Sequence, residues 1–203
     1  MSELPPEGPA SREPRARLLP AIVVAAIIAL VVPGGMGLDA AIAAPSAGTL
    51  TVGGSVTITA APGWVFVPSG GDAAGGDAPS GDASGGVQLQ KASAILVAQL
   101  VSSGYSGDSA SMLVEQQASL AGDSAQISYS DIHHTSIGDN DTTFVLFEAV
   151  VASGDRSGIV DGELVCMVVE GNAVVVVVAA PQGDLDPVID DVSAMLASVG
   201  VRR

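Results

Sequence analysis

Cysteine, aromatic and basic residues are scarce in this chain. Its only cysteine is Cys166, so no disulfide can form within the chain. Aromatic residues make up 3% of it, which leaves Val, Ile, Leu and Ala to fill a core. Seven Lys and Arg stand against 22 Asp and Glu, and the formal net charge is −15. Nucleic acids and anionic lipid surfaces are bound through basic side chains, so this composition argues against both as partners.

Charge is also absent from one long stretch near the N-terminus. Residues 1–17 are polar and contain Arg12, Arg15 and Arg17, whereas no residue from 18 to 38 is charged. As a helix this stretch would rise about 31 Å, close to the ~30 Å hydrocarbon core of a bilayer. We therefore predict a single transmembrane anchor over 18–38. Basic flanks stay in the cytoplasm, so residues 1–17 are expected inside and the C-terminal domain outside.

A cleaved signal peptide is the alternative for this stretch. Residues 33–35, Pro-Gly-Gly, would shorten its apolar core to signal-peptide length. Residues 41–43, Ala-Ile-Ala, resemble a cleavage site, and cleavage near Ala43 would release a secreted protein. Both interpretations place the residues after about 45 outside the cytoplasm. No acylatable cysteine follows the segment, which argues against a lipoprotein.

The exported part divides into a tether over 39–54 and a domain over 55–203. Within the domain, residues 69–86 repeat Gly-Asp-Ala every five residues and contain no large apolar side chain. Such a segment cannot offset its ordering entropy, so we predict a disordered insert. A calcium-binding loop is the alternative, but the repeat lacks the spacing of known calcium motifs.

The rest of the domain alternates β-type and helical patterns. We expect helices over 109–121 and from Pro187 to about Val199, the second capped by Asp186 and ended by Gly200. The run Val174–Val178 is continuously apolar, which favours a strand covered on both faces. Strands are predicted at 55–60, 87–91, 94–101, 125–136, 142–152, 158–170 and 173–180, the last two joined by a turn at 171–172. The runs 87–91 and 94–101 could also form one bent strand. This order predicts an α+β fold, an antiparallel sheet packed by two helices on one side.

The element order resembles a known family. Residues 62–64, Pro-Gly-Trp, follow the first strand, and the order of elements from about 50 to 199 is similar to that of the Mog1/PsbP-like domains of exported actinobacterial proteins. The bias toward Ala, Gly, Val and Asp also suits such an organism. The resemblance implies a sheet flanked by helices and a binding or adaptor role rather than catalysis. It assigns no functional residue to this chain.

Few residues suggest chemistry. His133 and His134 are the only histidines, and Asp131 lies close to them in sequence. Adjacent strand residues point to opposite faces, so the two imidazoles are not expected to share a metal ion. Cys166 lies in an apolar run typical of a core thiol. Trp64 is expected to pack in the core, with an exposed ligand platform as the alternative.

We therefore expect a non-enzymatic binding or accessory module of the cell envelope, anchored in the membrane through residues 18–38. Its partner would be an envelope protein, a lipid or a small ligand, and no cofactor is indicated. Trp64, His133 and His134 are the candidates for ligand or partner contact. The alternative is a hydrolase or metal-dependent enzyme that uses His133 or His134, although no G-x-S-x-G motif is present. A third hypothesis is an envelope protein whose acidic insert binds cations loosely.

Overall fold

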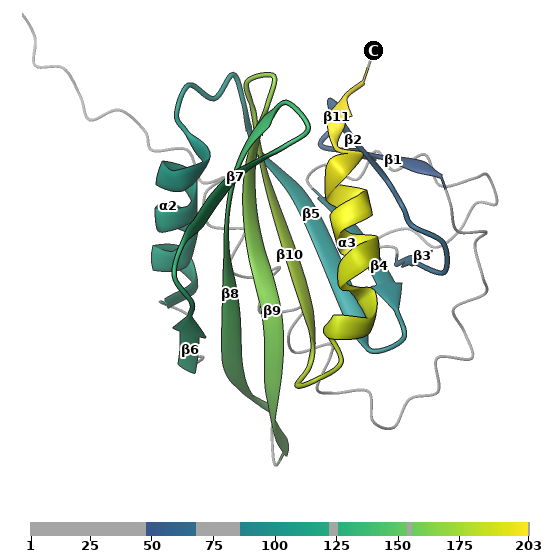
Figure 1. Ribbon diagram of the computed structural model, residues 1–203, viewed down its shortest axis with the longest axis vertical. Helices are drawn as coiled ribbons and strands as arrows, with labels where there is room; N and C mark the ends of the chain where they lie inside the picture. The colour runs from purple at the N-terminus through teal and green to yellow at the C-terminus, as the bar shows by residue number, and fades with distance from the viewer. Residues whose placement is uncertain (1–47, 68–85, 122–125, 154–155, 203) are drawn as a thin grey trace, which may run out of the picture.

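The computed structural model describes residues 48–67, 86–121, 126–153 and 156–202 (Figure 1). The predicted anchor at 18–38, the cleavage site at Ala43 and all but the last residue of the insert at 69–86 lie outside these ranges. They stay predictions. Within these ranges, no helix is long and apolar enough to cross a membrane.

Eight strands form one antiparallel sheet in the order β3–β4–β5–β10–β9–β8–β6, with β7 also paired to β8. Each pairing is antiparallel. For the consecutive strands that tight turns join, this confirms the prediction. The strands are β3 (Val65–Phe66), β4 (Gly86–Lys91), β5 (Ala94–Ser103), β6 (Gln126–Tyr129), β7 (His133–Ile137), β8 (Asn140–Ser153), β9 (Arg156–Val169) and β10 (Asn172–Pro181).

A smaller sheet of three strands lies beside the large one, in the order β1–β2–β11. It consists of β1 (Thr49–Val52), β2 (Val56–Thr59) and β11 (Gly200–Val201). Strand β1 lies inside the segment predicted as a tether, where Leu50 and Val52 alternate with Thr and pair with β2. Gly200 does not simply end a helix, because it belongs to β11 and pairs with Thr57 of β2.

Two helices cover opposite faces of the large sheet, so the prediction that both lie on one side was wrong. Helix α2 (Ser109–Ala121) contacts β8 and β9 on one face, and α3 (Ile189–Ala197) belongs to the apolar cluster on the other (Figure 1). Strand β10 supplies side chains to both clusters, its even-numbered residues from 174 to 180 to one and its odd-numbered residues from 173 to 179 to the other. The prediction that this strand is covered on both faces is thus confirmed.

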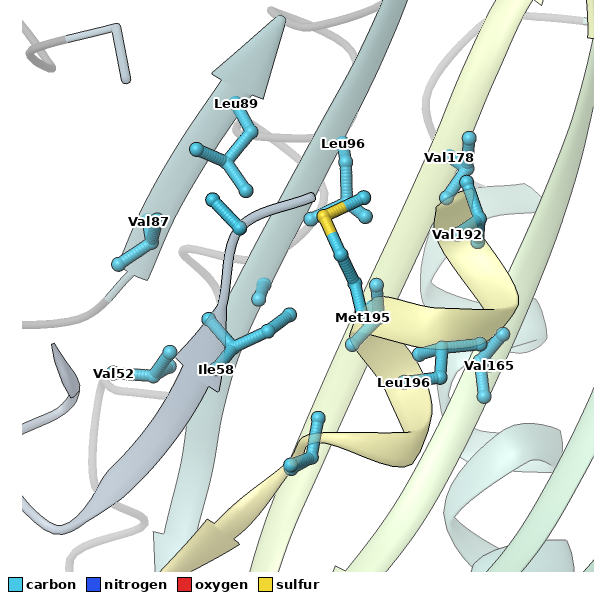
Figure 2. Packing of buried hydrophobic residues seen from close by; sticks show 14 of the residues in the cluster. Val52, Ile58, Val87, Leu89, Leu96, Val165, Val178, Val192, Met195 and Leu196 are labelled. Atoms are coloured by element: carbon cyan, nitrogen blue, oxygen red, sulfur yellow. The ribbon is translucent and has the colours of Figure 1, made fainter. Parts of the chain in front are cut away.

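Helix α3 packs through a narrow apolar stripe. Val192, Met195 and Leu196 are at most 3% exposed. Figure 2 shows them directed toward side chains of the sheet, among them Leu96, Val165 and Val178, with Ile58 of β2 alongside. Burying an apolar side chain of this size stabilises the fold by about 1.5–3 kcal/mol. Asp186 does not cap α3, because a 3-10 turn, η2 (Asp186–Val188), precedes the helix.

Two further boundaries differ from the prediction. The turn between β9 and β10 is formed by Glu170 and Gly171, both with positive φ, and Asn172 is already the first residue of β10. The side-chain amide of Asn172 donates hydrogen bonds to the carbonyl oxygens of Val169 and Glu170, which holds the turn one residue earlier than expected.

The strand predicted over 125–136 is interrupted. Tyr129 pairs with Phe147 and His133 pairs with Phe144, so the three residues 130–132 lie opposite the two residues 145–146. This extra residue is a β-bulge, which bends the edge strand and re-aims its side chains.

Candidate functional site

Trp64 is a core residue. Its side chain has no exposed surface, as the core-packing prediction required, so it offers no platform for a ligand. Its indole Nε1–H donates a hydrogen bond to Oδ2 of Asp191 at 3.1 Å. The Lys91 ammonium lies 2.5 Å from the same carboxylate oxygen and 3.4 Å from the Pro62 carbonyl oxygen. Residues 62–64 are thereby tied to α3.

Asp191 is therefore a structural acceptor. The hydrogen bond from Lys91, helped by that from Trp64, holds the pKa of the Asp191 carboxyl below its usual value, while desolvation opposes the shift. A carboxylate shared by an ammonium and an indole N–H favours its charged form. The three side chains join strand, loop and helix and leave no free group for chemistry.

His133 and His134 lie on opposite faces of β7, as the alternation of strand residues predicted. The His133 imidazole stacks on the Phe144 ring, with centroids 5.0 Å apart. The His134 ring lies on the α2 side, where Nδ1 is 2.9 Å from Oγ1 of Thr143. Both histidines are exposed, and no group of three or more His, Cys, Asp or Glu side chains suited to a metal ion occurs in the described ranges.

His134 belongs to a polar network at the start of α2. Its Nε2 is 3.4 Å from Oδ1 of Asp141, whose Oδ2 accepts a hydrogen bond of 2.8 Å from the backbone N–H of Ser109. The Ser109 hydroxyl is 2.6 Å from the Thr143 hydroxyl. Asp108 adds a cap, since its Oδ1 accepts the Ser111 N–H, and this hydrogen bond lowers the pKa of Asp108.

This network looks like an acid–base–hydroxyl arrangement, but its hydroxyls are closed to a substrate. Ser109 and Thr143 have no exposed surface. A nucleophile must reach the reacting carbon atom, so these hydroxyls cannot serve as one in this conformation. The network satisfies N–H groups at the start of α2 and fastens the helix to β7 and β8.

Cys166 is equally closed. It is fully buried in the cluster beneath α2, and burial raises the pKa of its thiol to about 12. The thiolate is the reactive form, so this cysteine is unreactive in the folded chain.

An open groove lies elsewhere, on the face of the large sheet that α3 covers only in part. Its volume is about 530 Å³. The floor includes Leu146 and Glu148 of β8 and Asp161 of β9. Ser128 of β6 lines the groove at the sheet edge, and Gly183, Leu185 and Asp186 line it on the other side. The rim loop is fixed to the floor, because the Gln182 side-chain amide donates to Glu148 at 3.4 Å and the Gly183 N–H donates to Asp161 at 3.0 Å.

Cross-strand pairs around the groove carry an unusual mixture of acidic and apolar side chains. Leu146 pairs with Glu163, Glu148 with Asp161, and Val150 with Ile159. Side chains at period two along a strand share a face, so all six lie on the α3 side. Leu146, Val150 and Ile159 are 45%, 42% and 40% exposed. We call this set of six residues, with the groove that adjoins it, the β8–β9 surface.

None of these six residues was among the sequence candidates. The alternation Leu146–Glu148–Val150 and Ile159–Asp161–Glu163 is visible in the sequence. This alternation is typical of a half-buried strand. How exposed these side chains are depends on how much of the sheet α3 covers. The signal was therefore present, but the sequence alone could not separate it from ordinary strand alternation.

No protein-family model matches the chain, and no curated protein matches it. Two solved structures are similar. The solution structure of the cyanobacterial PsbP (CyanoP) from Synechocystis sp. PCC 6803 is 12% identical, with a TM-score of 0.48 over 83% of this chain and 100% of that one. The crystal structure of LpqN, involved in cell envelope biogenesis of Mycobacterium tuberculosis, is 12% identical, with a TM-score of 0.39 over 73% of this chain and 83% of that one.

Proposed function

We propose that the domain is a non-enzymatic binding module outside the cytoplasm, held at the membrane by residues 18–38, and that its contact surface is the β8–β9 surface. The observation that carries the proposal is this surface itself. It combines an open groove with three exposed large apolar side chains, and such patches on a soluble domain are typical of interaction sites.

The chemistry of the groove favours binding over catalysis. Its carboxylates Glu148 and Asp161 already accept hydrogen bonds from residues 182 and 183. The Ser130 hydroxyl on the rim is held by the Leu146 N–H and the Asp131 carbonyl. Among the residues that line the groove in the described ranges, none is a histidine, cysteine or lysine that could act as base or nucleophile.

The location rests on the uncharged segment 18–38 and its arginine-rich flank. It can be tested by introducing one exposed cysteine, Ser193→Cys, on the outer side of α3. Because Cys166 is buried, an impermeant thiol reagent should report only the new site. Labelling in intact cells supports the topology, and labelling that requires lysis contradicts it. The N-terminal residue of the purified chain distinguishes the anchor from cleavage near Ala43.

The binding role can be tested by photo-crosslinking in living cells. A photoreactive amino acid replaces the exposed Ser128 in the groove, and the matched control replaces the exposed Ser193 on α3. We expect a discrete crosslinked product from position 128 that is absent from position 193. If the two positions give the same pattern, the β8–β9 surface is not the contact site.

A further inference from the structure

We infer that the β8–β9 surface binds an extended basic peptide segment, in which a lysine or arginine is flanked by apolar residues at two-residue spacing. This inference rests on the proposed function and adds the chemistry of the partner.

The centre of the surface carries unbalanced negative charge. Glu148 and Asp161 face each other directly across β8 and β9, and Asp186 adds a third carboxylate on the rim. Like charges in opposed strand positions destabilise a sheet. None of the groove-lining residues in the described part of the chain is basic. A cation from a partner that entered the groove would relieve this repulsion between Glu148 and Asp161.

Glu163 extends the acidic region toward α3. It neighbours Leu146 of β8 and Val178 of β10, and desolvation raises the pKa of its carboxyl. Among the side chains that the structure describes, none forms an ion pair with Glu163. A partly buried carboxylate without a cation is costly to the free domain, and a bound ammonium or guanidinium group would offset that cost.

The apolar side chains set the spacing of the ligand. Leu146, Glu148 and Val150 follow one another at every second residue of β8, and Ile159 lies opposite Val150. Alternate residues of an extended chain are about 6.8 Å apart. A peptide laid along β8 in an extended conformation therefore brings apolar, basic and apolar side chains over Leu146, Glu148 and Val150 in turn.

Other occupants fit the charge less well. A second copy would bring another net charge of −15 to an acidic surface, and anionic lipid would be repelled. A purely apolar ligand would desolvate the facing carboxylates of Glu148 and Asp161 without supplying a cation. A basic and apolar segment satisfies both kinds of side chain at once.

The test uses the full chain in detergent micelles and three fluorescent peptides. In the first peptide every second residue is serine, and the positions between are leucine, lysine and leucine in turn. The second peptide has glutamate in place of lysine, and the third has glutamine in place of lysine. Fluorescence anisotropy should show saturable binding of the lysine peptide that weakens as salt is raised. The glutamate peptide should not bind, and the glutamine peptide should bind at least tenfold more weakly.

Two isosteric double variants locate the site. Glu148→Gln with Asp161→Asn removes both charges while keeping oxygen acceptors for Gln182 and Gly183, and should weaken binding of the lysine peptide about tenfold. Glu115→Gln with Asp190→Asn removes the same charge from exposed positions on α2 and α3 and should leave affinity unchanged. Leu146→Ser tests the apolar part and should weaken binding several-fold.

Equal binding of the lysine and glutamine peptides would overturn the inference in favour of an apolar ligand. Equal losses in the two double variants would show that only the overall charge acts. Self-association of the chain that Leu146→Ser abolishes would identify a second copy as the occupant. If position 128 crosslinks a partner while the lysine peptide fails to bind, the inference fails and the binding role stands. If position 128 gives no crosslink and the lysine peptide does not bind, both this inference and the proposed binding role are wrong.

Discussion

Gly162 is the position where the sheet tolerates a side chain least. It lies opposite Phe147, whose ring covers the space that a side chain at 162 would occupy. A Cβ atom there would lie 2.5 Å from the carbonyl oxygen of Val178 and closer still to Cζ of Phe147. The Phe147 ring could rotate away from the new side chain. The Val178 oxygen cannot move in the same way, because it belongs to the backbone of the central strand β10. We therefore predict that Gly162→Ala is strongly destabilising.

The size of the effect follows from the two clashes. Overpacking a well-packed core costs about 1–3 kcal/mol. The backbone clash places Gly162→Ala at the upper end, about 3 kcal/mol, which is a large part of the ~5–15 kcal/mol of a typical domain. With a urea dependence of about 1–3 kcal/mol per molar, the unfolding midpoint should fall by about 1–3 M.

The assay is equilibrium unfolding in urea followed by the emission of Trp64, the single tryptophan. It is fully buried, so its emission should shift to the red on unfolding. Gly200→Ala is the matched control, because a Cβ there meets nothing within 4 Å, and it should move the midpoint little. Adding Phe147→Leu to Gly162→Ala should cost less than the sum of the single changes, since one clash disappears. Equal midpoints for the two glycine variants would show that the β8–β9 register is wrong.

Three further predictions concern titratable groups. Cys166 should not react with a thiol reagent at pH 8 in the native chain and should react fully in urea; native labelling within minutes would contradict its burial. Asp191→Asn should lower stability at neutral pH, and the difference from wild type should vanish as the pH falls below about 4, because the depressed pKa of Asp191 stabilises the fold only while the carboxyl is charged. Glu163→Gln should raise the urea midpoint at pH 7, because burial penalises the charged carboxylate, and this gain should disappear in acid; a lower midpoint at pH 7 would indicate a cation partner for Glu163.

Local patterns predicted several elements well. Helix 109–121 has the observed bounds, with Asp108 as its cap, because composition and capping are encoded within a few residues. The apolar run Val174–Val178 correctly indicated a strand covered on both faces. That same observation conflicts with the prediction of both helices on one side, since a strand apolar on both faces needs cover on both. Which face of the sheet each helix covers depends on long-range packing, and the periodicity of apolar residues in the sequence carries no information about it.

The candidate site was less accessible to sequence reasoning. His133 and His134 stood out as the only histidines, yet one stacks on Phe144 and the other joins the network at the start of α2. Trp64 was correctly expected to be buried, but its bond to Asp191 joins residues 127 positions apart in sequence. Contacts of this kind depend on the packing of elements that are distant in sequence, so no local sequence pattern predicts them.

The β8–β9 surface follows from a mismatch in length between the hairpin and its cover. Strands β8 and β9 have 14 residues each, whereas α3 has nine. At about 3.4 Å per strand residue and 1.5 Å per helix residue, each strand is about three and a half times as long as the helix. Figure 1 shows the end of the hairpin projecting beyond both helices. A part of a sheet that is exposed only because no helix covers it would be expected to carry polar residues of mixed charge. Instead, this part carries Leu146, Val150 and Ile159 around two opposed carboxylates, which costs stability in the free domain. The proposed partner, which is both apolar and basic, accounts for this arrangement.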